Sequence, residues 1–563
     1  MTCCPNLRSW FAAALTAGVF ATVMFIASCN RSPAPAPAPP SAPGITRVQP
    51  AVPAVPIGVP KEVFQAANTG DWTMFGGTPA RNMVNLTAKN LPVEWDVDDG
   101  KNVLWTADLG SRAYGGPVIA GGQIYVGTNN QNPRDKNDIK NGEPIDLGVL
   151  MSFNVKDGKF LWQTTFPKLA AGRVVDWPLE GLCSTPTIEG TLLYYVNNRC
   201  EVICSQHDGR IVWKLDMIGK LGVFPHNLAV CSPLLIDNYL WIVTANGVDE
   251  GHINVPAPKA PSFIKLDKRD GKVLWQNNDP TVKLTEAPKG GDQEASIKQL
   301  VNRGELVQHG QWSNPAYAVV QSQPQIIFPG GNGWIYSFDP DGKLLWRFDC
   351  NPKDSFYELG SKGTRNDFIA TPVIYDNKIY IGVGQDPEHL VAVGHLWCID
   401  MNKRGDVSPD LVTDGSVFPP KSKANPNSAA VWHYGGRTTP EDQAKLKRNY
   451  YFGRTMSTCA IHDGLVYAAD LNGYLNCLDA ATGKLYWSHF TKAETWCSPV
   501  WADGKVYIGN DNGSVFVFAH GKDKKILAEN LMPGPVRMAP IVPSNNVLYL
   551  MTNNKLYALA NQK

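Results

Sequence analysis

The run Asp270-Gly271-Lys272-Val273-Leu274-Trp275 decides the fold, because close copies of it return along the chain. Each copy places Asp-Gly or Thr-Gly between alternating apolar residues, where glycine accepts the positive φ of a tight hairpin turn. The strand after the turn ends on a tryptophan, whose large ring can fill the gap between neighbouring sheets. The other copies are residues 157–162, 208–213, 341–346 and 482–487. The 563 residues are therefore predicted to form a repeat architecture rather than several unrelated domains.

A second landmark precedes each turn: a small residue, in most copies followed by proline, and then two alternating strands joined by a turn. It occurs eight times, at Gly116-Pro117, Thr185-Pro186, Ser232-Pro233, Asn314-Pro315, Thr371-Pro372, Thr458-Cys459, Ser498-Pro499 and Ala539-Pro540. The compact copies are 40 residues apart, from 459 to 499, and 41 residues apart, from 499 to 540. That spacing is the size of a four-stranded propeller blade.

The two ends of the repeat region complement each other. The last copy supplies three strands, and Asn102-Val103-Leu104-Trp105, near the start, is a tryptophan strand that belongs to no complete copy. Pairing these ends closes a ring and removes exposed sheet edges. We therefore predict an all-β fold, an eight-bladed β-propeller of four-stranded blades whose last blade is completed by an N-terminal strand. The fifth closing strand (430–432) would follow an inserted loop, and the seventh (525–527) lacks tryptophan.

The N-terminal region has the features of an export signal. Arg8 precedes an apolar stretch at 10–26, and small residues then lead to Cys29. Ile-Ala-Ser-Cys resembles the bacterial lipobox, in which the cysteine is lipidated; an uncleaved membrane anchor is the alternative. By the same resemblance, Asn30 favours the outer membrane. We predict a lipoprotein signal peptide at 1–28, a Pro/Ala-rich tether at 29–65 and the propeller at 66–563, with lipidated Cys29 anchoring an exported protein that faces the periplasm.

Composition excludes some function classes. The 52 Lys+Arg and 51 Asp+Glu leave a formal charge of +1, which gives no electrostatic reason to expect a nucleic-acid partner. Nine cysteines follow Cys29, and this odd number in an exported chain leaves at least one free or paired with another chain. Most of them lie in apolar strand patterns, as small buried residues do. The ten histidines form no His-x-x-x-His or His-Glu motif, so no metal site is predicted.

The repeats, with Asp71-Trp72-Thr73-Met74-Phe75-Gly76-Gly77 before them, resemble the pyrroloquinoline-quinone (PQQ) repeat superfamily from about residue 71 to 561. The superfamily includes quinoprotein alcohol dehydrogenases, which bind PQQ and calcium in the ring centre. It also includes BamB-type lipoprotein scaffolds of outer-membrane β-barrel assembly, which bind no cofactor. The dehydrogenases typically carry a disulfide between adjacent cysteines, and the only adjacent pair here, Cys3-Cys4, lies in the signal segment. No acidic residue matches their catalytic or calcium-binding motif, so the resemblance implies no catalytic residue and no cofactor.

Strand order assigns each loop to a face of the ring. Most insertions fall on the face opposite the Asp-Gly turns, at 129–148, 247–260, 276–312, 384–395 and 435–454, whereas 404–427 falls on the turn face. Elaborated loops on a rigid scaffold are where binding usually resides. Residues just before each innermost strand should surround the mouth of the central channel on that loop-rich face. The predicted ligand- or partner-binding residues are Arg112, His226, Gln311, Trp312, Arg365, Arg454, Glu494, Trp496 and Arg537.

Two functions remain open on this evidence. Four arginines at one mouth suit a carboxylate-bearing ligand, either an acidic peptide or PQQ, because guanidinium groups bind carboxylates bidentately. Alternatively, they are solvated rim arginines, some paired with Glu180 or Glu494. The first hypothesis is a membrane-tethered scaffold that binds an envelope protein or peptide. The second is a PQQ- and calcium-dependent oxidoreductase acting on an alcohol or sugar; the missing enzyme-specific motifs favour the first.

Overall fold

A computed structural model describes residues 70–172, 175–252, 254–280, 309–358, 362–387, 393–537 and 541–562. The described residues all belong to one compact unit. The predicted signal peptide, Cys29 and the tether at 29–65 lie outside the described residues. Among the residues described, no helix has the length and hydropathy needed to cross a membrane.

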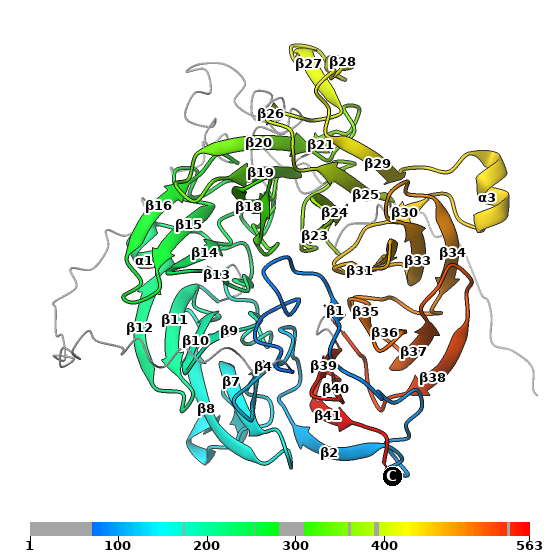
Figure 1. Cartoon of the computed structure of the whole chain (residues 1–563). Helices are drawn as coiled ribbons and strands as arrows, with labels where there is room; N and C mark the ends of the chain where they lie inside the picture. Colours follow the sequence, from blue (N-terminus) through cyan, green and yellow to red (C-terminus); the bar gives the residue numbers. More distant parts are fainter. Residues whose placement is uncertain are drawn as a thin grey trace, which may run out of the picture. The chain divides into compact units, whose positions relative to one another are not determined.

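Eight sheets, each with four principal strands, form a ring (Figure 1), which confirms the predicted eight-bladed propeller. Blades 1 to 4 are β3 (Val118–Ala120), β4 (Gln123–Asn129), β7 (Leu147–Asn154), β8 (Phe160–Pro167); β9 (Thr187–Glu189), β10 (Leu192–Val196), β11 (Glu201–Gln206), β12 (Ile211–Asp216); β13 (Leu234–Ile236), β14 (Tyr239–Val243), β15 (Phe263–Asp267), β16 (Val273–Asn277); and β17 (Ala316–Val320), β18 (Gln323–Pro329), β19 (Trp334–Phe338), β20 (Leu344–Asp349). Blades 5 to 8 are β23 (Val373–Tyr375), β24 (Lys378–Val383), β25 (Val393–Asp400), β29 (Ala430–Gly435); β31 (Ala460–His462), β32 (Leu465–Ala469), β33 (Tyr474–Asp479), β34 (Leu485–Phe490); β35 (Val500–Ala502), β36 (Lys505–Gly509), β37 (Ser514–Ala519), β38 (Ile526–Leu531); and β39 (Val542–Ser544), β40 (Val547–Met551), β41 (Lys555–Leu559), β2 (Val103–Asp108).

The eighth blade closes the ring as predicted. Its outermost strand β2 comes from the start of the body and pairs antiparallel with β41, with Val103 opposite Leu559 and Asp108 opposite Lys555. The predicted closing strands of blades 5 and 7 are β29 and β38. In blades 1 to 7 the four principal strands run outward in chain order from an innermost strand at the central channel, and blade 8 differs only in its outermost strand β2.

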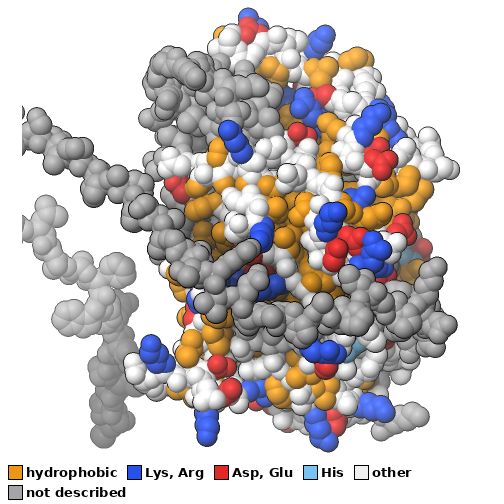
Figure 2. Space-filling view, turned by 90° about the vertical axis from the view of Figure 1, so that its left-hand side faces the viewer, with side chains coloured by type: hydrophobic (Ala, Val, Ile, Leu, Met, Phe, Trp, Pro, Cys, Tyr) orange, Lys and Arg blue, Asp and Glu red, His pale blue; other side chains and the backbone are white. Residues whose placement is uncertain are grey.

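Short elements decorate this ring. The hairpins are β5 (Ile139–Lys140) with β6 (Glu143–Pro144), β21 (Tyr357–Glu358) with β22 (Lys362–Gly363), and β27 (Asp410–Asp414) with β28 (Lys421–Ala424). In the part of the chain that the structure describes, the helices are η2 (Lys136–Asp138), α1 (Met217–Leu221) and α3 (Pro440–Leu446). The short strands β1 (Val84–Asn85), β26 (Gly405–Asp406) and β30 (Phe452–Gly453) extend three of the blades. Hairpin β27–β28 and helix α3 project from the rim in Figure 1. Figure 2 shows basic and acidic side chains interspersed on one side of the molecule, in keeping with the balanced charge.

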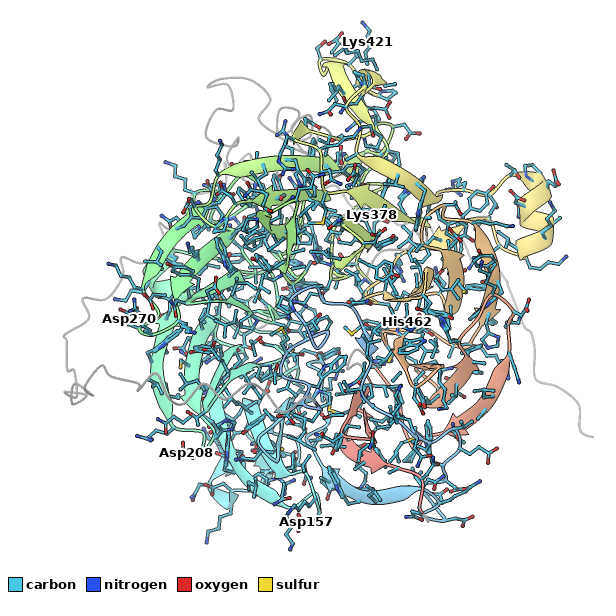
Figure 3. All side chains as sticks on the ribbon, in the orientation of Figure 1. Asp157, Asp208, Asp270, Lys378, Lys421 and His462 are labelled. Atoms are coloured by element: carbon cyan, nitrogen blue, oxygen red, sulfur yellow. The ribbon has the colours of Figure 1, made fainter. Side chains whose placement is uncertain are left out.

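The Asp-Gly turns of one blade receive the tryptophan of the blade before it. Gly209 has φ of +83°, and a Cβ at this position would lie 2.7 Å from the Trp162 ring. Glycine is therefore required twice, for the left-handed backbone and for the space that the ring occupies. The other pairs of this kind are Trp105 with Gly158, Trp213 with Gly271, Trp275 with Gly342 and Trp432 with Gly483. Figure 3 labels Asp157, Asp208 and Asp270, which lie in these turns at the outer edge of the ring.

The small residue of the second landmark joins neighbouring blades. The Thr185 hydroxyl accepts a hydrogen bond from the Gly116 N–H of blade 1 at 2.8 Å. The Thr185 N–H donates in turn to the Ser232 hydroxyl of blade 3 at 3.0 Å. Corresponding bonds join Ser232 to Asn314, Asn314 to Thr371, and Thr458 to Ser498. Through these short polar side chains, the bonds link blades 1 to 5 in sequence and blade 6 to blade 7 around the channel.

Residues 70–85, here called the plug, cross the centre of the ring, where Figure 1 shows them in blue. They bond to or pair with the innermost region of every blade: Trp72 with Ile119, Thr73 with Ile188, Arg81 with Ser232, Pro79 with Tyr317, Ala80 with Ile374, Asn82 with Ile461, Val84 with Trp501, and Asn85 with Pro543. A single peptide segment therefore closes one end of the channel.

Arg81 is the centre of the plug and has 0% exposure. Its guanidinium donates to the carbonyls of Phe75, Ser232, Pro233 and Pro315 at 2.9–3.1 Å. Burial lowers the pKa of Arg81 to about 10, so it stays charged at neutral pH and is stabilised by carbonyl dipoles. The nine described cysteines are all buried free thiols, consistent with the packing role predicted for most of them.

Candidate functional site

A cavity of about 310 Å³ lies in the central channel, above the plug. The small polar residues that link neighbouring blades contribute Thr185, Ser232, Asn314, Thr371, Thr458 and Ser498 to its lining, and Phe75 of the plug bounds it. Most of the other lining residues directly precede an innermost strand, which places them on the loop-rich face. Because the plug closes the opposite end, a ligand would enter from the loop-rich face. The volume is near the lower end of ligand pockets, about 300–1,000 Å³.

The wall of the cavity is mostly aromatic and aliphatic. Trp177, Trp312 and Trp496 contribute indoles from three different inter-blade connections, and half-buried Leu228 and Val230 also line the cavity. Apolar walls with few polar groups are typical of binding pockets, because desolvation strengthens each polar contact inside them. The cavity therefore suits an apolar group that carries one or two polar atoms.

Arg112 and Glu180 provide the charged pair of the cavity. Arg112 Nη1 contacts Glu180 Oε1, and the same nitrogen donates to the Tyr114 hydroxyl at 3.2 Å. The Arg112 side chain is 43% exposed whereas that of Glu180 is 6% exposed, so the carboxylate lies behind the guanidinium. Burial raises the pKa of the Glu180 carboxyl, and Arg112 acts in the opposite direction. Arg112 thus offers its remaining N–H donors to a ligand while its orientation is fixed from behind.

The other three predicted arginines are held elsewhere. Arg365 is buried, with Nη2 at 3.4 Å from both Asp349 Oδ1 and the Asn332 carbonyl. Burial lowers the pKa of Arg365, and Asp349 opposes that shift. Arg454 Nη1 donates to the Asp386 carbonyl at 3.1 Å. Of the four arginines, only Arg112 lines the cavity.

Glu494, Trp496 and Arg537 form a small cluster at the rim. Arg537 Nη2 pairs with Asp511 Oδ2 at 2.7 Å, and its guanidinium lies 5.6 Å from the centre of the Trp496 ring. The Trp496 indole donates to Glu494 Oε2 at 3.3 Å, and Glu494 is exposed. Trp496 is the member of this cluster that lines the cavity.

His226, Gln311 and Trp312 lie together on another side of the channel. The Trp312 indole donates to the His226 carbonyl at 3.1 Å and stacks on its imidazole, with ring centres 5.6 Å apart. Gln311 is buried, and its Oε1 accepts from the Gly331 N–H at 2.7 Å. Gln311 therefore holds the Gly331 backbone behind the cavity wall, and Trp312 connects the wall to His226.

The structure also assembles a group that the sequence did not predict, here called the histidine cluster: His226, His252, His309 and Asp386. Every member is at most 5% exposed. One ligand atom from each of the three histidines lies within 4.8 Å of the others, and the same holds for His309, Asp367 and Asp386. Asp386 also lines the cavity. Imidazole and carboxylate groups at this spacing are metal-ligand types.

The members of the cluster come from loops of three blades. His226 and His309 precede β13 and β17, His252 lies between β14 and β15, and Asp386 follows β24. Sequence motifs missed them because no two are neighbours in the chain. His226 was predicted at the channel mouth because it precedes an innermost strand. The loops between the second and third strands lie on the same face, and including them would also have identified His252 and Asp386.

Comparisons with known proteins agree on the fold and family. A family model described as outer membrane protein assembly factor BamB matches residues 146–307 and 331–562, more than half of the chain. The BamB of Yersinia pestis is 22% identical over 382 residues, which cover 66% of this chain and 80% of that protein. A polyvinylalcohol dehydrogenase from a Pseudomonas species is 20% identical over 377 residues, 61% of this chain and 51% of that protein. The structure of a europium-containing methanol dehydrogenase shares the fold, with a TM-score of 0.55, 13% identity, and coverage of 88% of this chain and 98% of that one.

Proposed function

The chain belongs to the family of the outer membrane protein assembly factor BamB, and on that premise we propose that it is a binding scaffold of the bacterial cell envelope. Its partner is an envelope protein, a segment of which enters the cavity from the loop-rich face. The observation that carries this proposal is the blind cavity, which is bounded by the plug and lined by three indoles and Arg112.

The chemistry of the cavity defines the segment that would bind. An apolar side chain fits among Trp177, Trp312 and Trp496, and an acidic side chain or a peptide carbonyl fits the N–H donors of Arg112. A volume of about 310 Å³ accommodates one or two side chains rather than a folded domain, so the surrounding loops would contact the rest of the partner.

We further propose that lipidated Cys29 anchors the protein in the outer membrane, with the body in the periplasm and the stretch 29–65 as an extended tether. Cys29→Ser in the native host tests this. We expect loss of radiolabelled fatty-acid incorporation and transfer of the protein from the membrane fraction to the soluble periplasmic fraction. Undiminished labelling in the Cys29→Ser variant would contradict the anchor.

The second candidate function, a PQQ- and calcium-dependent oxidoreductase, has a weaker basis in the cavity. PQQ carries three carboxylates, but three of the predicted arginines are held by Asp349, by the Asp386 carbonyl and by Asp511. Calcium requires several oxygen ligands, and of the two carboxylates lining the cavity Glu180 is paired with Arg112. These residues do not fit the cofactor, and we propose that none is bound. Calorimetric titration of the full-length protein with PQQ, with and without calcium, is expected to show no saturable binding.

Site-specific photo-crosslinking in the native host tests the scaffold proposal. A benzophenone amino acid at Leu228, inside the cavity, is expected to yield a discrete adduct with one envelope protein. The matched control is the same amino acid at Val212, which is 47% exposed on the outermost strand of blade 2. Equal adducts from both positions, or none from Leu228, would count against binding at the cavity.

A further inference from the structure

The wall between the cavity and blades 3, 4 and 5 contains a second site. We propose that the histidine cluster binds one divalent transition-metal ion, with zinc as the expected occupant. The proposal is independent of the scaffold function, because it depends only on residues within the wall.

The first argument is the donor set and its spacing. His309 Nε2 lies 2.8 Å and His252 Nε2 3.9 Å from Asp386 Oδ2, so the carboxylate faces two imidazoles. The His226 ring centre lies 4.6 Å from those of both His252 and His309. Zinc in proteins is commonly held by three or four nitrogen, sulfur or oxygen ligands about 2.0–2.2 Å from the metal. Small side-chain rotations, with release of the proton shared by His309 Nε2 and Asp386, would bring these donor atoms from their present separations to that geometry.

The second argument is that backbone carbonyls select the tautomer that a metal needs. His226 Nδ1 lies 2.9 Å from the Val248 carbonyl, and His252 Nδ1 lies 3.1 Å from the Glu250 carbonyl. A carbonyl only accepts, so each Nδ1 carries the proton and each Nε2 carries the lone pair. Orientation of an imidazole by a hydrogen bond from its other nitrogen is typical of metal-binding histidines.

The third argument is electrostatic. Asp367 and Asp386 are both buried, and both lie within 4.8 Å of a nitrogen of His309. Two buried carboxylates balance the charge of a divalent cation, whereas three neutral imidazoles alone would leave it uncompensated in a water-poor site.

The fourth argument is that the backbone is shaped around His226. A Cβ at Gly247 would lie 2.9 Å from the His226 Cβ, and a Cβ at Gly310 would lie 3.0 Å from it. Neither glycine has a positive φ, so space rather than backbone freedom accounts for both. The two loops thereby approach His226 from both sides, and the stacked Trp312 fixes its ring plane. The site is preorganised rather than an accidental meeting of mobile side chains.

The ligand types favour zinc over calcium or magnesium. Imidazole nitrogens suit zinc, copper, nickel and iron, whereas calcium and magnesium prefer oxygen-only shells. A buried shell filled by four protein ligands is typical of structural rather than catalytic zinc. The ion would connect loops of three adjacent blades and fix the side of the cavity formed by Trp312 and Asp386.

Metal titration of the full-length chain, purified in detergent and stripped with a chelator, tests the proposal. We expect one equivalent of zinc per chain by calorimetry. Cobalt should bind competitively and give visible absorption of a four-coordinate nitrogen–oxygen site. His309→Gln and His252→Gln should each weaken zinc binding by about 100-fold or more.

His433→Gln is the matched control, because His433 also contacts another histidine and lies in β29 away from the cluster. It should bind zinc like the wild type. Absence of saturable binding by the wild type, or equal affinities in His309→Gln and His433→Gln, would overturn the proposal. If His309→Gln fails to fold, His252→Gln and X-ray absorption of the cobalt-loaded wild type still decide the matter, because fewer than two imidazole ligands would contradict the site.

Discussion

The indole nitrogen of Trp162 donates a hydrogen bond of 2.7 Å to the backbone carbonyl of His207, in the Asp-Gly turn of the next blade. The same relation joins Trp105 to Val155, Trp213 to Lys268, Trp432 to Ala480 and Trp487 to Gly521. The tryptophan thus packs on a turn glycine and also satisfies a turn carbonyl. This double contact explains why turn and tryptophan recur together in the sequence.

Replacing a turn glycine that contacts a tryptophan should lower the free energy of unfolding by more than backbone strain alone would. Gly271 has φ of +72°, and a Cβ would lie 2.6 Å from the Trp213 ring, whereas Gly464 has φ of +71° and no atom within 4 Å of its Cβ. We expect Gly464→Ala to destabilise by about 1 kcal/mol through strain alone. Gly271→Ala should cost about 1–3 kcal/mol more, because the ring must move. Denaturant unfolding measures both, and equal losses would show that the tryptophan contact contributes nothing.

Arg81 should be essential to the plug. Arg81→Met removes hydrogen bonds to four carbonyls and leaves those within the channel unsatisfied, so we expect a loss of about 3 kcal/mol or more. Arg210→Met is the control, because that side chain is 67% exposed in an Asp-Gly turn and should change stability by less than about 0.5 kcal/mol. A shift in the urea midpoint no larger for Arg81→Met than for Arg210→Met would refute this role.

A hydrogen-bonded pair of histidines, of which His395 is buried, should make stability depend on pH. His395 and His433 are hydrogen-bonded at 2.8 Å, and burial lowers their pKa values to about 3 and about 4 from the ordinary 6.5. Between pH 6.5 and 4 the unfolded chain binds protons that the folded chain does not. Their contribution is therefore present above pH 6.5 and is lost as pH falls below it, by up to about 1.4 kcal/mol per pH unit for buried His395. Solvent around the more exposed His433 makes its contribution smaller.

The double variant His395→Gln/His433→Gln isolates this contribution. Its unfolding midpoint should fall less steeply than that of the wild type between pH 6.5 and 4.5. Parallel pH profiles for the two proteins would mean that other groups cause the acid sensitivity.

Filling the cavity should block the proposed partner. Val230→Trp places a large ring among Trp177 and Leu228, and we expect partner binding to weaken by about tenfold or more. Val212→Trp makes the same change on the outer edge of blade 2 and should leave binding intact. The yield of the Leu228 photo-adduct in each background measures the effect; an undiminished yield in Val230→Trp would place the contact outside the cavity.

The fold could be predicted because its determinants are local. Asp-Gly turns, a tryptophan at fixed spacing and a small residue before each innermost strand all lie within one repeat, and each proves to make a specific contact between blades. The closing strand β2 was predictable from one incomplete repeat. The plug was not, because residues 70–85 show neither repeat landmark and pair with eight separate blades.

The site was only partly predictable. Topology placed Arg112, Trp312 and Trp496 at the channel, and all three line the cavity. It could not show that Arg365 is held by Asp349, since that carboxylate ends the outermost strand of the preceding blade. Side-chain pairing across blades depends on packing that strand order does not encode. The histidine cluster was not predicted for the same reason, because its members meet only through packing between blades.

The plug also determines how the propeller would respond to mechanical force. Tension that reaches the body through Gly70 meets Trp72, Arg81 and Asn85 in turn, each bonded to a different part of the ring. Extraction of this segment would therefore have to break several sets of hydrogen bonds one after another, whereas removal of an outer strand separates that strand from a single neighbour. We therefore expect that pulling the plug out of the ring requires more force than separating strand β2 from strand β41.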